Sequence, residues 1–122
     1  MNLKDLLDSS LIETATADTK QQAIDTLLGM MHRRGCIADL DAFRKEIYQR
    51  EAEFSSDISP YLSIPHAKSP EVLRPAVAAM RTKDNRTVFL IASNDDNEHI
   101  KTLSALAEAL LEGGSLQHFF EK

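Results

Sequence analysis

The sequence has few of the residues on which several common binding motifs depend. Its 122 residues include four glycines, four prolines and one cysteine. The glycines, Gly29, Gly35, Gly113 and Gly114, nowhere have the spacing of a P-loop or of a dinucleotide-binding fingerprint, so nucleotide binding through either motif is excluded. A single cysteine, Cys36, cannot form an internal disulfide, and we expect it to be a small buried thiol.

Long apolar runs and basic runs are also missing. No segment has the length of a membrane span, and "MNLKDLLDSS" lacks the basic flank and unbroken apolar stretch of a secretory signal, so we expect a cytoplasmic protein. Fourteen basic and nineteen acidic residues give a net charge of -5, without a basic face that could follow phosphates. Nucleic-acid binding is disfavoured, and a basic protein partner is modestly favoured.

Metal ligands at the usual spacing are lacking as well. The four histidines, His32, His66, His99 and His118, form no i, i+4 pair, and there is no Cys-x-x-Cys. We therefore expect no metal and no cofactor. The length and the globular composition, with 43% hydrophobic residues, predict one domain spanning residues 1–122.

Two amphipathic helices are predicted in the first half of the chain. The first covers residues 17–35, with Asp18 as a possible cap, Gln21 three positions later and Gly35 at its end. The second covers residues 39–54. Its predicted apolar stripe consists of Leu40, Phe43, Ile47 and Phe54.

The second half of the chain reads differently. Residues 55–75 have no helical period, and all four prolines lie there, so we expect an ordered extended connection with a short strand at 61–64. The runs "AVAAM" and "TVFLIAS" predict buried strands, residues 94–114 predict a capped helix, and a last short helix is possible at 115–122. This order of elements predicts a three-layer α/β (α+β) sandwich with helices on both faces of the sheet.

His66 is the first candidate for a functional side chain. It follows the predicted strand at 61–64 directly behind Pro65, whose ring fixes the backbone there, so its imidazole can be aimed at low entropic cost. The alternative is a partly exposed loop histidine without a task.

His99 and Arg50 are the other two candidates. His99 lies in the first turn of the helix predicted at 94–114, where the helix dipole favours a neutral imidazole that can both donate and accept a hydrogen bond. Arg50 lies near the end of the second helix, from which a guanidinium can bind a phosphoryl or carboxylate group bidentately. The alternatives are a histidine that only begins a helix, and an arginine paired on the surface with Glu46 or Glu53.

Together these segments resemble the EIIA domain of the fructose/mannitol type (type 2) of the sugar phosphotransferase system. The resemblance rests on the opening "LKDLLD", the "TKQQAIDTLLGMM" helix, "REAEFSSDISPYLSIPHAK" and "NEHIKTLSALAEALL", in that order over almost the whole chain. It implies a mixed sheet sandwiched by helices. It also implies a cytoplasmic phosphocarrier enzyme that takes a phosphoryl group from HPr and passes it to the EIIB component of a sugar permease.

The resemblance also assigns roles to the candidate residues. It implies that His66 accepts the phosphoryl group as a phosphohistidine and that His99 and Arg50 assist. Phosphoryl transfer demands positioning and charge stabilisation more than covalent chemistry, which suits these residue types.

Three positions depart from the family pattern. Ser59, Tyr61 and Ser63 stand where relatives commonly have glycines or another small residue. Two rival functions therefore stay open. One is a nitrogen-related regulatory EIIA, and the other is a degenerate EIIA-like binding module that is not phosphorylated.

Overall fold

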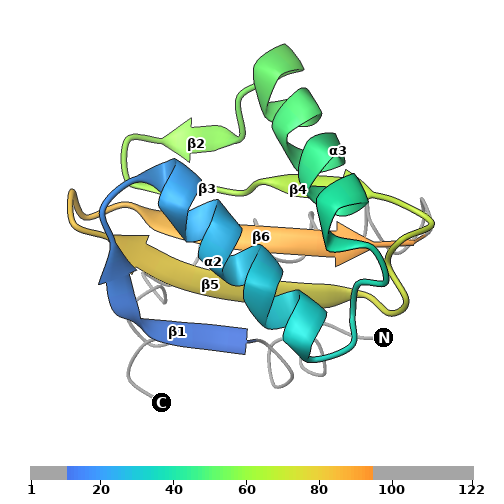
Figure 1. Cartoon of the computed structure of the whole chain (residues 1–122). Coiled ribbons are helices and arrows are strands. Elements are labelled where there is room, and N and C mark those ends of the chain that lie inside the picture. Colours follow the sequence, from blue (N-terminus) through green and yellow to red (C-terminus); the bar gives the residue numbers. More distant parts are fainter. Residues whose placement is uncertain (1–10, 95–122) are drawn as a thin grey trace.

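The computed structural model describes residues 11–94, which form a six-stranded sheet with two helices lying against one of its faces (Figure 1). The helices are α2 (Lys20–Arg33) and α3 (Leu40–Glu53). The strands are β1 (Leu11–Ala17), β2 (Asp57–Ser59), β3 (Leu62–Ser63), β4 (His66–Lys68), β5 (Ala76–Thr82) and β6 (Thr87–Ser93). In this part of the chain, no helix is long and apolar enough to cross a membrane.

The sheet is mixed and is built around β6. Its strand order is β1-β5-β6-β3-β2, and β4 also pairs with β6. β5 and β6 are antiparallel, as are β2 and β3, whereas β1 runs parallel to β5 and both β3 and β4 run parallel to β6. The expectation of a mixed α/β fold is confirmed. Apart from Asn94, the helices predicted at 94–114 and 115–122 lie outside the described residues, as does the opening "LKDLLD" segment.

The strands "AVAAM" and "TVFLIAS" were predicted correctly as β5 and β6. Every residue of β6 is buried, so the strand has no solvent-exposed face. Its sequence is therefore a continuous run and does not alternate between apolar and polar residues. The core of the molecule forms where α2 covers these two strands. It includes Leu27, Leu28, Met31, Val88 and Leu90.

The first helix is shorter than the predicted range of 17–35, and its N-cap lies one residue later than predicted. Thr19, and not Asp18, is its N-cap, because the Thr19 hydroxyl accepts a hydrogen bond from the Gln22 backbone N–H at 3.1 Å. Gln22 in turn accepts from the Asp18 N–H, so the reciprocal pattern of a capping box is shifted by one position. Gly35 follows the helix with a φ of +75°, which a residue with a Cβ rarely adopts.

The second helix was predicted with correct ends and one wrong apolar position. Asp39 caps it by accepting from the Ala42 N–H at 3.1 Å, and Phe43 and Ile47 are buried as expected. Phe54 is 77% exposed. The helix stops at Glu53, and the extended backbone of Phe54 takes its ring out of the helical stripe.

Three strands had no clear signal in the sequence. β1 is an edge strand with mostly exposed or half-buried residues, and β2 and β4 have three residues each within the predicted extended connection. These segments are strands because β1 pairs with β5, β2 with β3 and β4 with β6. The partners of β1 and β4 lie far from them in the sequence.

Candidate functional site

Pro65 interrupts the strand that carries the candidate histidine. β3 pairs with the start of β6 and β4 with its end, so residues 62–68 run along one strand with a break at Ile64 and Pro65. Proline has no N–H to donate to a ladder, and at the break the Ile64 N–H donates instead to the Ser56 carbonyl at 3.0 Å. The pairing resumes where the Ile91 N–H donates to the Pro65 carbonyl at 2.9 Å. The break thus has a fixed geometry.

The break also holds the imidazole of His66. His66 Nδ1 lies 2.8 Å from the carbonyl oxygen of Ile64, a residue outside both ladders. A carbonyl can only accept, so in the neutral ring the proton is on Nδ1 and Nε2 has the lone pair. The side chain is half-buried. The backbone therefore selects the tautomer in which Nε2 has the lone pair.

A hollow of about 100 Å³ lies beside this imidazole. It is formed where the end of α3 turns towards β2. Its lining consists of Arg50, Glu51, Phe54, Ser55, Ser56 and His66. The structure thus brings His66 and Arg50, which are sixteen positions apart, to the wall of one cavity.

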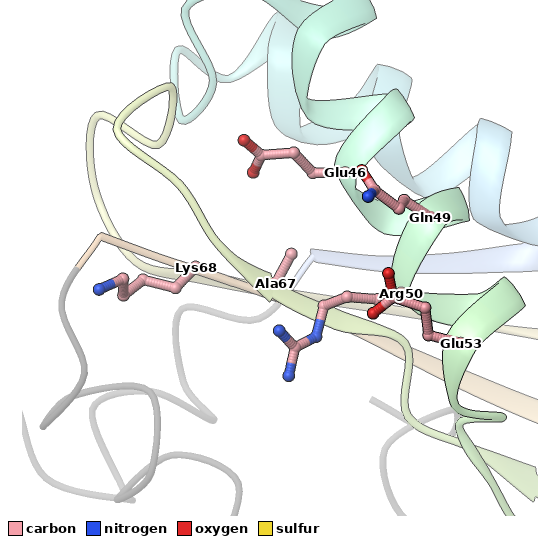
Figure 2. A pocket seen from close by; sticks show the side chains of 6 residues that line it. All are labelled: Glu46, Gln49, Arg50, Glu53, Ala67 and Lys68. Carbon is pink, nitrogen blue, oxygen red and sulfur yellow. The ribbon is translucent and has the colours of Figure 1, made fainter.

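Arg50 also lines a second hollow of about 220 Å³, between α3 and β4 (Figure 2). Figure 2 shows its guanidinium extending from the helix towards β4. Among the described residues Arg50 forms no ion pair, and so the expected alternative of a surface pair with Glu46 or Glu53 is not found there. Arg44 makes the arginine pairs of this helix, with Asp41 and Asp25.

The acidic neighbour of Arg50 is neutralised from another element. Glu51 accepts a hydrogen bond from the Lys20 ammonium at 2.6 Å, and Lys20 also contacts Asp57 at 2.9 Å. Burial by itself would lower the pKa of Lys20, but its hydrogen bonds to the two carboxylates outweigh burial and raise the pKa. Lys20 is therefore charged, and the Glu51 carboxylate adds little repulsion to an anion in the hollow.

Asp57 joins this pair to the base of the β2–β3 hairpin. Its carboxylate accepts from Ser63 Oγ at 2.6 Å and lies 3.2 Å from the Arg86 guanidinium, which also donates to Ser63 Oγ at 2.6 Å. The hydrogen bond from Lys20, and then that from Ser63, hold the pKa of Asp57 below its usual value. These five residues, Lys20, Glu51, Asp57, Ser63 and Arg86, form a polar cluster that ties α2 and α3 to the hairpin preceding His66.

The comparisons with known proteins agree with this architecture. Residues 5–120 match the model of the family described as phosphoenolpyruvate-dependent sugar phosphotransferase system, EIIA 2. The chain belongs to this family. The resemblance seen in the sequence is confirmed, and with it the assignment to a phosphotransferase system.

Relatives of this EIIA 2 domain include two fructose-specific proteins. The PTS system fructose-specific EIIABC component of Bacillus subtilis is 30% identical over 125 residues, which cover 91% of this chain and 20% of that protein. The PTS system fructose-specific EIIA component of Haloferax volcanii is 31% identical over 106 residues, which cover 76% of this chain and 69% of that protein. The chain thus spans a fifth of one relative and about two thirds of the other.

Two solved structures share the fold of the EIIA 2 domain. IIA mannitol from Escherichia coli matches with a TM-score of 0.74 and 20% identity, over 93% of this chain and 88% of that one. The nitrogen regulatory protein IIA-Ntr from Neisseria meningitidis matches with a TM-score of 0.73 and 17% identity, over 92% and 85%. At these identities the likeness shows the fold alone.

The remaining predicted positions of the EIIA 2 domain separate into three cases. His99 lies outside the described residues, so its role stays a prediction. Tyr61 is 61% exposed and lines neither of the two hollows beside Arg50, and Ser63 is buried within the polar cluster. Within residues 11–94, no group of three His, Cys, Asp or Glu side chains is placed to hold a metal ion.

Sequence reasoning overlooked the partners that surround the candidate residues. Lys20 is 31 and 37 positions from its two carboxylates, and Arg86 is 23 positions from Ser63. No periodicity or motif in the sequence indicates contacts between residues so far apart along the chain. Only the folded chain places the N-terminal turn of α2 against Glu51, which lines the hollow beside His66.

Proposed function

We propose that this EIIA 2 domain is a phosphocarrier in which His66 Nε2 accepts a phosphoryl group from the phosphohistidine of HPr and passes it to an EIIB component for sugar uptake. The observation that carries this proposal is the 2.8 Å contact between His66 Nδ1 and the Ile64 carbonyl, beside Arg50 in one hollow. This contact defines which nitrogen of the uncharged ring has the lone pair, next to a cation.

The transfer needs little from the protein beyond this arrangement. The Nε2 lone pair attacks phosphorus in line as the bond from phosphorus to the donor imidazole breaks, and the other ring proton stays on Nδ1, which donates to the Ile64 carbonyl throughout. Arg50 offsets the charge of the phosphoryl oxygens. His99, by the family resemblance, donates to the same oxygens. The reverse attack by an EIIB nucleophile completes the cycle.

The relatives support the proposed acceptor and the proposed branch. The EIIABC component of Bacillus subtilis has an EIIA part in one chain with further components, which supports EIIB as the acceptor. Both relatives matched by sequence are named fructose-specific, which favours sugar transport over the regulatory branch. We also propose that residues 1–122 act as one domain, which the family match over residues 5–120 supports, and that this domain works in the cytoplasm.

Labelling tests the carrier function directly. The protein is mixed with enzyme I, HPr and labelled phosphoenolpyruvate, and acid-labile label on the chain is counted. We expect label on the wild type and none on His66→Ala, while His32→Ala, an exposed residue at the end of α2, keeps the label. Phosphorus NMR should place the group on Nε2. An unlabelled wild type with several HPr donors would contradict the proposal and favour the degenerate binding module.

A further inference from the structure

Ser56 lines the hollow and has no role assigned by the sequence or by the family resemblance. It lies between the end of α3 and β2, is 7% exposed and lines the same hollow as His66 and Arg50. Its carbonyl accepts from the Ile64 N–H at 3.0 Å, and the Ile64 carbonyl faces His66 Nδ1. Ile64 therefore links the backbone of Ser56 to the imidazole of His66.

The hydroxyl of Ser56 is buried and unpaired in the described structure. Among the described residues, Ser56 Oγ has no hydrogen-bond partner. Two other buried serines are bonded. Ser63 Oγ contacts Asp57 and Arg86, and Ser69 Oγ accepts from the Glu71 N–H at 3.1 Å. A buried unpaired hydroxyl destabilises a fold, so its presence beside a candidate nucleophile calls for a ligand.

We propose that Ser56 is a phosphoryl-binding residue, whose hydroxyl donates a hydrogen bond to an oxygen of the phosphoryl group on His66. The inference rests on the proposed carrier function and adds a residue to it. No covalent bond forms at Ser56. Its short side chain has three staggered rotamers, and since no hydrogen bond holds the hydroxyl among the described residues, it can turn towards the phosphoryl oxygens without losing one.

The chemistry of the group explains why one cation is not enough. A phosphoryl group presents three oxygens, and a guanidinium satisfies at most two of them in its bidentate geometry. A hydroxyl donor in a position shielded from water can satisfy another, at the moment when charge is spread over all three. The neighbouring Ser55 fits this task less well, because it is exposed and its Oγ accepts from the Asp57 N–H.

The test compares Ser56→Ala with a matched buried serine, Ser69→Ala, which lies after β4 and lines neither hollow beside Arg50. Rates of His66 phosphorylation from labelled phospho-HPr are measured together with melting temperatures. We expect Ser56→Ala to slow transfer by about 10- to 100-fold, as expected for the loss of one donor to a charged transition state. Its melting temperature should stay equal or rise, because an unpaired buried hydroxyl has been removed.

The control should behave in the opposite way. Ser69→Ala removes a bonded hydroxyl, so its melting temperature should fall while its transfer rate stays close to that of the wild type. Transfer by Ser56→Ala at the wild-type rate would overturn the proposal. A parallel loss of transfer and thermal stability in Ser56→Ala would also overturn it, since that result indicates a structural role.

Failure of the carrier function gives a different pattern. If the wild type takes no label, or His66→Ala keeps it, the carrier proposal fails whatever Ser56→Ala does. If the wild type is labelled on His66 and Ser56→Ala is equally fast, the assignment of Ser56 alone fails.

Discussion

Replacing Asp57 by asparagine should loosen the hairpin that precedes His66. The asparagine would keep the shape of the side chain and lose the charge that faces Lys20 at 2.9 Å and Arg86 at 3.2 Å. Within the polar cluster, Lys20 would retain the Glu51 carboxylate, while Arg86 would retain the uncharged Ser63 hydroxyl. The Arg86 side chain is 17% exposed, so the variant removes a neutralising charge from a site that is largely closed to solvent.

The size of the effect lies between two limits. Exposed ion pairs contribute about 0–1 kcal/mol, and breaking a fully buried pair costs about 3–5 kcal/mol. The Asp57 side chain is 40% exposed, so solvent screens much of its attraction, and we expect a loss of about 1–2 kcal/mol in the free energy of unfolding. For a chain of this length the melting temperature should fall by about 6 °C.

The pH dependence fixes the sign of the effect. The pKa of Asp57 is lowered in the folded state from its ordinary value of 3.8, so the carboxylate stabilises the fold above that pH. The stabilisation is lost as the pH falls through the lowered pKa. Thermal melts of wild type and Asp57→Asn should differ fully at neutral pH and converge in acid.

A surface pair provides the control. Asp18 contacts Lys83 at 2.5 Å, but both side chains are more than half exposed, so Asp18→Asn should leave the melting temperature within experimental error. Equal melting temperatures for Asp57→Asn and Asp18→Asn, or a gap that persists unchanged in acid, would refute the reasoning about the polar cluster.

Three further changes test other parts of the structure. Tyr61→Gly removes an exposed ring that lines neither hollow, so phosphorylation of His66 should be unchanged or faster, and a large loss would place Tyr61 in the site. Burial, and then a 2.7 Å hydrogen bond to Asp25, raise the pKa of Tyr48 well above 10.0. In Tyr61→Phe, Tyr48 is the one tyrosine left, and its ultraviolet absorbance should show no phenolate as the pH passes 10.0. In Gly35→Ala the added Cβ would meet no atom within 4 Å, but the alanine would have to keep a positive φ. Urea unfolding should therefore show a loss of about 1 kcal/mol in the free energy of unfolding.

Local signals in the sequence predicted the elements that position the site. The caps and apolar stripes of α2 and α3, and the apolar runs of β5 and β6, depend on neighbours within a few residues. Apart from Phe54, they were correct to within about two positions. β4 was predicted only as extended chain, because three residues that include His66 and Lys68 have no period. Its strand character comes from the register with Ile91 and Ser93.

The candidate site was predictable in its residue types and only partly in its contacts. Pro65 indicated a fixed backbone at His66, but the Ile64 carbonyl that selects the tautomer depends on where the strand breaks. Likewise, Arg50 was suggested by its chemistry. Its place beside His66 depends on the reversal of the chain between α3 and β4, which no local pattern reports.

One departure from the family pattern, Ser63, belongs to the polar cluster. The serine at position 63 is fully buried, and its hydroxyl is bonded on both sides, to Asp57 and to Arg86. Ser63 thus forms a link within the hairpin, and it does not line the hollow beside His66. Tyr61 is exposed and has no positive φ, since Asn85 is the only described residue other than glycine that does, so its backbone does not require glycine. Neither Ser63 nor Tyr61 lines the hollow beside His66 in the described part of the chain, so these two departures do not block that hollow.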